Sequence, residues 1–217
     1  MRANSRTITS NQTGPHPALA NTVRRHLSSR HCPPVADHDR RACESLLERL
    51  AQSPRPLVLD SFCGTGHSTR ELARRHPEHL VAGVDKSAHR LGKHPGADNG
   101  DYLLLRADCT ALWRLLAGAG VRADYHYLLY PNPWPKARHL GRRVHGHPGL
   151  AALLALGGRL ELRSNWRLYV EEFCAALHLA DRGGAVERVP EVAAPLSLFE
   201  RKYRDSSHTL WRCRAEL

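Results

Sequence analysis

Four polar residues that could bind a charged nucleoside each stand at the end of a predicted strand. They are Asp60, Asp85, Asp108 and Asn132. Carboxylate oxygens accept hydrogen bonds from ribose hydroxyls and amino groups, and they attract positive charge. In an open α/β sheet, ligands bind at the edge formed by the carboxyl ends of the strands. The sequence therefore predicts one ligand-binding edge that holds all four residues.

The first of these residues opens the segment DSFCGTG, residues 60–66. Gly64 and Gly66 let the backbone approach a ligand closely, and the free N–H groups of the following helix point toward the same place. Asp85 follows the glycines by about 20 residues, the spacing at which a carboxylate binds the ribose of an adenosine cofactor. This spacing fits a dinucleotide as well as S-adenosylmethionine.

Two features favour S-adenosylmethionine over a dinucleotide. Thr69 stands where the dinucleotide motif G-x-G-x-x-G would have its third glycine. Asp60 would repel a pyrophosphate, whereas it would attract the amino and sulfonium cations of S-adenosylmethionine. Asp108 is open to two interpretations, since it could bind the adenine amino group or cap the next helix. Together these residues predict a Rossmann-like methyltransferase, but they do not identify its substrate.

Alternating strands and helices must position these residues. We predict strands at residues 57–60, 80–84, 102–105, 124–129 and 159–162, with two last strand candidates at 186–192 and 208–214. Helices are predicted at residues 67–76, 109–116, 150–156 and 166–179. Such alternation is typical of an α/β fold with a doubly wound, mostly parallel sheet. The last two candidates are close enough in the sequence to pair, which predicts an antiparallel C-terminal strand.

The chain divides into an N-terminal arm and one domain. Residues 1–35 are rich in Ser, Asn, Thr, Pro and Arg and poor in large apolar groups. This composition predicts an extended or partly disordered arm, with a short helix at 19–27. Residues 36–217 are predicted to form the methyltransferase domain, which begins with an amphipathic helix that ends near Ser53.

The composition bounds the partners and the location of the protein. The formal net charge of +11 favours an acidic partner such as nucleic acid. The six cysteines form no C-x-x-C pair and the fifteen histidines no H-E-x-x-H pattern, so we expect no metal site. We expect a cytoplasmic protein without membrane association, because no apolar run reaches about 18 residues and no signal peptide is evident. The oligomeric state stays open, with a monomer favoured.

A stiff segment joined to a basic one, YPNPWPKARHLGRR at residues 130–143, follows the fourth predicted strand. Each proline biases the residue before it toward extended backbone, so Tyr130, Asn132 and Trp134 are predicted to be extended. This stiffness would present Asn132 to the cofactor edge at little entropic cost. The basic run begins where the prolines end, so it could bind the phosphates of a polyanion.

Six segments together resemble the bacterial tRNA (guanine-N7)-methyltransferase family, whose members have the class I methyltransferase fold and methylate guanosine in the tRNA variable loop. The segments are LDSFCGTG, GVDKS, RADCT, YPNPWPKARHLGRR, LALGGRLELRSNWRLYVEE and LFERKYRDSSHTLWR. They occur in the family's order between residues 59 and 212. The segment with prolines, tryptophan and lysine is the most specific of them.

The resemblance implies a role for each matching residue. Cofactor contacts with S-adenosyl-L-methionine would fall on Asp60, Gly64, Gly66, Asp85, Lys86, Asp108 and Asn132. Contacts with the tRNA substrate would fall on Lys136, Arg138, Arg142, Arg143, Asn165, Ser197, Phe199 and Glu200. Asn132 would be the catalytic residue, between the methionine moiety and the target base. An ion pair with Arg201 or Arg204 is the alternative role for Glu200.

Three positions depart from the family. Asn132 and Asn165 stand where the family usually has Asp, and Ser197-Leu198 where it has Thr-Lys. An amide accepts hydrogen bonds on one side and donates on the other, unlike a carboxylate. Two alternatives therefore stay open: a methyltransferase acting on another nitrogen, in another RNA or a small heteroaromatic molecule, and a non-catalytic RNA-binding relative. The adjacent acids Glu171 and Glu172 are expected to be surface or capping charges.

Overall fold

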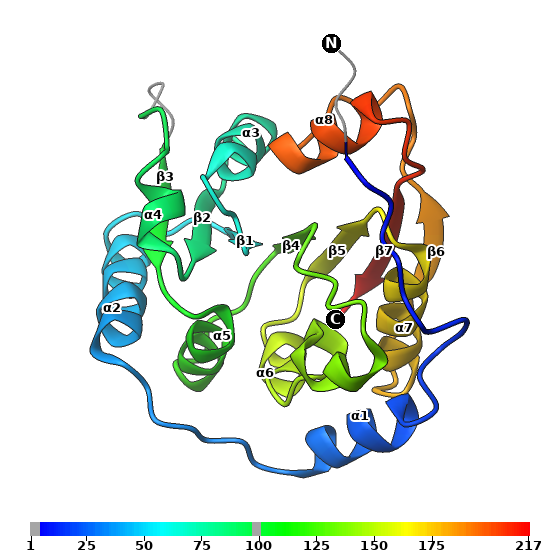
Figure 1. The fold of residues 1–217 in the computed structure, drawn as a ribbon. Helices are drawn as coiled ribbons and strands as arrows, with labels where there is room; N and C mark the ends of the chain where they lie inside the picture. Colours follow the sequence, from blue (N-terminus) through cyan, green and yellow to red (C-terminus); the bar gives the residue numbers. More distant parts are fainter. Residues whose placement is uncertain (1–4, 97–100) are drawn as a thin grey trace.

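A sheet of seven strands runs through the computed structural model, which describes residues 5–96 and 101–217 (Figure 1). Its strand order is β3-β2-β1-β4-β5-β7-β6. The strands are β1 Leu57–Ser61, β2 Leu80–Asp85, β3 Tyr102–Arg106, β4 Tyr125–Leu129, β5 Arg159–Ser164, β6 Ala185–Arg188 and β7 Trp211–Glu216. The first five are parallel, and β7 is antiparallel to both of its neighbours. This is the predicted doubly wound α/β fold with an antiparallel C-terminal strand.

Helices cover both faces of the sheet. Alternate strand residues point to opposite faces, and apolar side chains on both faces pack against helices. The helices are α1 Leu19–Ser28, α2 Asp37–Gln52, α3 His67–Arg75, α4 Ala88–Leu91, α5 Cys109–Gly118, α6 Leu150–Ala155, α7 Arg167–His178 and α8 Leu198–Asp205. Leu57 and Leu59 of β1 pack in the large core formed with α1, α2, α5, α6 and α7. Val58 between them packs in a smaller cluster with Leu72 of α3. The sheet is therefore buried between two apolar layers near β1.

Most of these elements agree with the sequence predictions, but one helix and two 3₁₀ turns do not. The helix predicted at 19–27 is confirmed as α1, and the predicted pairing of the last two strands is confirmed as β6 with β7. The helix α8 and the 3₁₀ turns η1 Ala137–Arg142 and η2 Val144–Gly146 were not predicted. The only residue of α8 that is buried is the charged Glu200. The sequence of α8 therefore lacks the buried apolar stripe from which an amphipathic helix is predicted.

None of the helices within residues 5–96 and 101–217 is long and apolar enough to cross a membrane. In the same residues, no group of three or more His, Cys, Asp and Glu side chains could hold a metal ion.

Candidate active site

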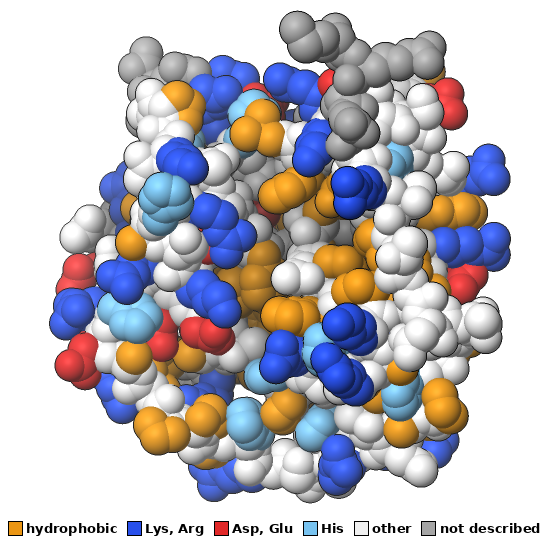
Figure 2. Space-filling model, viewed as in Figure 1, with side chains coloured by type: hydrophobic (Ala, Val, Ile, Leu, Met, Phe, Trp, Pro, Cys, Tyr) orange, Lys and Arg blue, Asp and Glu red, His pale blue; other side chains and the backbone are white. Residues whose placement is uncertain are grey.

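The carboxyl ends of four parallel strands bring the predicted polar residues to one edge of the sheet. Asp60 lies in β1, Asp85 is the last residue of β2, Asp108 follows β3 and Asn132 follows β4. These strands are neighbours in the order β3-β2-β1-β4. Figure 2 shows the molecule hollowed near its middle, with hydrophobic side chains inside the hollow and Lys and Arg side chains around it.

The glycine loop after β1 has the backbone geometry that a bound ligand would require. Phe62, Gly64 and Gly66 have φ values of 64°, 63° and 75°. A side chain at Gly66 would lie 2.7 Å from Leu104, but a side chain at Gly64 would meet nothing within 4 Å. The Gly64 N–H donates to Asp85 Oδ2 at 3.0 Å. The loop is therefore fixed from one side and open at Gly64, where a ligand can approach the backbone.

Asp85 joins the glycine loop to the turn after β2. Its Oδ1 accepts from the Ser87 N–H at 2.8 Å and lies 3.0 Å from an Arg90 guanidinium nitrogen. A carboxylate has about four lone-pair sites, and these contacts together with the Gly64 N–H use three of them. Arg90 and the neighbouring Lys86 are exposed. Ribose hydroxyls can therefore reach this carboxylate if they displace the Arg90 side chain.

Asp60 has an acceptor atom that nothing in the described chain satisfies. Its Oδ2 accepts from the hydroxyls of Ser68 at 2.6 Å and Thr69 at 2.8 Å. Its Oδ1 is buried and has no hydrogen-bond partner among the described residues. Burial raises the pKa of the Asp60 carboxyl to about 6. A buried carboxylate oxygen without a partner is costly, so this site fits a cationic donor such as the amino group of S-adenosylmethionine.

Asp108 caps the helix that follows it, as one of its two interpretations predicted. Its Oδ1 accepts from the backbone N–H groups of Thr110 at 2.9 Å and Ala111 at 3.3 Å. No hydrogen bond to Oδ2 is present within the described residues. Asp108 also borders a pocket of about 630 Å³, whose other wall includes residues of the segment 29–36. The capping role leaves Oδ2 for a ligand, so the adenine contact stays a prediction.

The proline-rich loop after β4 differs from its predicted geometry. Tyr130 and Trp134 have positive φ values of 56° and 46° and are not extended. The Tyr130 N–H donates to Arg163 O at 2.9 Å, and the Trp134 N–H donates to Asn132 Oδ1 at 3.2 Å. These hydrogen bonds override the local preference set by the prolines, at a cost of about 1–3 kcal/mol for each strained residue. Asn132 is exposed, and its amide nitrogen is left to donate outward.

The basic run contains exposed and buried arginines. Lys136, Arg138 and Arg142 are exposed, and the Arg142 guanidinium lies 4.8 Å from the centre of the Trp134 ring. Arg143 is completely buried instead. Its Nε and Nη2 both donate to Trp134 O at 3.2 Å. The predicted phosphate contact of Arg143 is therefore wrong, because this guanidinium is inside the protein.

The buried partner of Arg143 is Glu172 on α7. Both side chains are 0% exposed, so the expectation that Glu172 is a surface charge is also wrong. His145 Nε2 donates to the same carboxylate at 3.0 Å. Helical spacing could have revealed this position, because Glu172 shares a face of α7 with the buried Tyr169. The ion pair holds the end of the basic run against α7.

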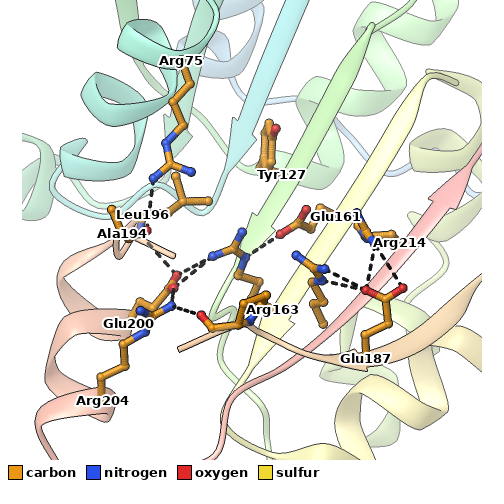
Figure 3. A network of polar contacts seen from close by, with 12 residues as sticks. Arg75, Tyr127, Glu161, Arg163, Glu187, Ala194, Leu196, Glu200, Arg204 and Arg214 are labelled. Carbon is orange, nitrogen blue, oxygen red and sulfur yellow. Dashed lines mark hydrogen bonds and ion pairs between the residues drawn. The ribbon is translucent and has the colours of Figure 1, made fainter. Parts of the chain in front are cut away.

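Glu200 lies in a second buried charge network, shown in Figure 3. Its two oxygens each lie 3.0 Å from Arg163 Nη1, and Oε1 accepts from Arg204 at 2.8 Å. Glu200 is 0% exposed, so the structure does not support its predicted substrate contact. The alternative ion pair with Arg204 is confirmed. A short helix that begins with Ser197 as its N-cap turns this carboxylate inward, toward β5.

The remaining predicted substrate residues lie around this network. Ser197 is 8% exposed and its hydroxyl accepts from the Glu200 N–H, whereas Phe199 is 50% exposed. The Phe199 ring stacks on Tyr203 with 6.2 Å between ring centres. Asn165 follows β5, half-buried, and pairs with the imidazole of His208. Phe199 is the member of this group that offers an open surface to a substrate.

Comparisons with known proteins identify the family and the fold of the chain. The sequence model of a family described as "putative methyltransferase" matches residues 54–213. A tRNA (guanine-N(7)-)-methyltransferase of Leifsonia xyli subsp. xyli (strain CTCB07) is 31% identical over 182 residues, covering 76% of this chain and 78% of the relative. A protein of the same name from Pseudomonas savastanoi pv. phaseolicola (strain 1448A / Race 6) is 31% identical over 173 residues, covering 74% and 70%. The crystal structure of the 16S rRNA methyltransferase KamB aligns with a TM-score of 0.60 at 18% identity, covering 87% of this chain and 96% of that one, which shows the shared fold.

Proposed function

The chain belongs to this methyltransferase family, and we propose that it transfers the methyl group of S-adenosylmethionine to N7 of a guanosine in tRNA. The observation that carries the proposal is the loop at 130–143. It places an exposed amide, Asn132, after β4 at the cofactor edge and follows it with the exposed cations Lys136, Arg138 and Arg142. A base that reaches the amide would therefore bring its flanking phosphates to these cations.

Methyl transfer requires mainly that the nucleophile and the methyl group are aligned. S-adenosylmethionine supplies a methyl group bound to a positively charged sulfur. A nucleophile aligned with the carbon–sulfur bond takes the methyl group, and the sulfur leaves as uncharged S-adenosylhomocysteine. Guanine N7 has a lone pair and no proton, so no side chain has to act as a general base. The residues of this chain then serve to bind, orient and exclude water. This agrees with the site as formed by residues 5–96 and 101–217, in which we identify no pair of side chains arranged as acid and base.

The amide of Asn132 suits the edge of guanine that carries N7. In the structure its Oδ1 is held by the Trp134 N–H, so the amide nitrogen is the end that remains available. Guanine presents two acceptors on this edge, O6 and N7. We propose that the Asn132 amide donates to O6 and leaves N7 free to attack the methyl group. A carboxylate at this position could not donate this hydrogen bond.

Nucleoside mass spectrometry tests the proposed function directly. We expect 7-methylguanosine to accumulate when the protein is incubated with unmodified tRNA and S-adenosylmethionine. Methylation of a different base would contradict guanine N7 and favour the alternative of another nitrogen nucleophile. The absence of any methylated nucleoside, in a preparation that binds S-adenosylhomocysteine, would favour the non-catalytic relative.

The buried Asp60 predicts how cofactor affinity depends on pH. Burial raises the pKa of its carboxyl to about 6, and the proposed cationic ligand prefers the ionised form. The affinity for S-adenosylhomocysteine, which keeps the amino cation, should therefore be constant above about pH 7. Below about pH 6 it should fall by up to about tenfold per pH unit, because one proton competes with the ligand. Isothermal titration calorimetry between pH 5 and 8 measures this.

The variant Asp60→Asn is the control for that titration. It keeps an acceptor for Ser68 and Thr69 but cannot ionise. We expect weaker binding at pH 7.5 and a flat profile between pH 5 and 7. An unchanged slope in this variant would mean that another group causes the pH dependence.

A further inference from the structure

The N-terminal arm is attached to the active-site edge at its first described residue. The Ser5 N–H donates to Ser206 Oγ at 3.1 Å, and His208 Nε2 donates to Ser5 O at 3.0 Å. The other ring nitrogen of His208, Nδ1, lies 3.1 Å from the amide nitrogen of Asn165. Figure 1 shows the arm passing from α8 along β7 and α7 before it reaches α1.

The arm is attached again at the basic loop. Ser10 Oγ donates to Pro135 O at 2.5 Å, and Asn11 Oδ1 accepts from the Ala137 N–H at 3.2 Å. Gln12 then reaches the buried ion pair, where its Nε2 donates to Glu172 Oε1 at 2.5 Å and its Oε1 accepts from Arg143 at 3.0 Å. The loop after β4 and the arm are therefore held together by backbone and side-chain hydrogen bonds.

A pocket of about 450 Å³ lies between the arm and the loop. It is lined by Thr9, Ser10, Asn11, Lys136, Ala137 and Arg138. Lys136 and Arg138 are exposed, and neither has an acidic partner within the described residues. The Asn11 amide nitrogen also makes no hydrogen bond to the described part of the chain, because only its oxygen is used. The lining therefore combines two unneutralised cations with a hydroxyl and an amide that can donate.

We propose that this pocket binds a backbone phosphate of the RNA substrate, so that the N-terminal arm forms part of the RNA site. Lys136 and Arg138 neutralise the phosphate charge, while Asn11 and Thr9 donate hydrogen bonds to its oxygens. The pocket is large enough for one phosphate and the adjoining sugar. This inference rests on the proposed action on RNA, but it concerns binding and not the methylated atom.

The variant Asn11→Asp separates the ligand contact from the attachment of the arm. Aspartate keeps the oxygen that accepts from the Ala137 N–H and replaces the free donor by a negative charge. The matched control is Asn21→Asp, which makes the same charge change at an exposed position of α1. Fluorescence anisotropy with end-labelled tRNA measures the affinity of both variants, and calorimetry measures their affinity for S-adenosylhomocysteine.

We expect Asn11→Asp to weaken tRNA binding at least about tenfold relative to Asn21→Asp. The slope of log affinity against log salt should become shallower by about one, and the cofactor affinity should not change. Equal tRNA affinities for the two variants, or a wild-type protein that binds no tRNA, would overturn the inference. If Asn11→Asp weakens binding but the wild type forms no 7-methylguanosine, the phosphate site stands and the proposed methylation fails.

Discussion

The variant Glu172→Ala is expected to lower the free energy of unfolding by about 3–5 kcal/mol. Alanine would leave the Arg143 guanidinium buried without its counter-charge, and both side chains are 0% exposed in the native structure. The same substitution removes the acceptor of Gln12, His16 and His145. Urea denaturation followed by circular dichroism measures the loss.

The neighbouring Glu171 provides the matched control. Its ion pair with Arg167 is on the surface, where such pairs contribute about 0–1 kcal/mol, so Glu171→Ala should change stability within that range. Equal costs for the two variants would contradict the buried role of Glu172. If Glu172→Ala does not fold, the double change Glu172→Leu with Arg143→Met should restore folding, since it removes both charges together.

The parallel half of the sheet was predictable because its strands are buried on both faces. Such strands appear in the sequence as short apolar runs, and Leu57 to Leu59 and Leu80 to Val84 are examples. Asp60, Asp85 and Asp108 lie in or just after the ends of parallel strands. Parallel strands have their carboxyl ends at the same edge of a sheet, so the position of these residues at one edge was predictable. Contacts with the ligand do not follow from topology, so the roles of these residues remain predictions.

The buried charges were the part that local patterns predicted poorly. Arg143 belongs to a basic run, and runs of charge usually face solvent, but the loop turns this arginine inward. Its partner Glu172 is far away in the sequence, so the pair exists through tertiary contacts alone. The backbone of Tyr130 differs from the prediction for the same reason, because its N–H donates to the distant Arg163 carbonyl. Trp134 differs for a local reason, because its N–H donates to the side chain of Asn132 two residues earlier.

The variant Asp85→Asn is expected to weaken S-adenosylhomocysteine binding by about 100-fold or more. The proposed pair of ribose hydroxyls would each lose a hydrogen bond to a charged acceptor, worth about 1.5–3 kcal/mol. The glycine loop would change as well. The carboxylate accepts from the Gly64 N–H with one oxygen and from the Ser87 N–H with the other, and an amide can accept on only one side.

The experiment must distinguish a local loss of ligand contacts in Asp85→Asn from unfolding of the variant. Asp124→Asn makes the same chemical change just before β4, where the carboxylate is exposed and pairs with His79. This variant should bind S-adenosylhomocysteine with the affinity of the wild type. Circular dichroism should show that both variants keep the native secondary structure. If folded Asp85→Asn binds S-adenosylhomocysteine with the affinity of the wild type, the ribose does not bind at the end of β2. Loss of affinity in both variants would mean that removing an acid anywhere weakens binding, so the local hydrogen bonds of Asp85 would not be the cause.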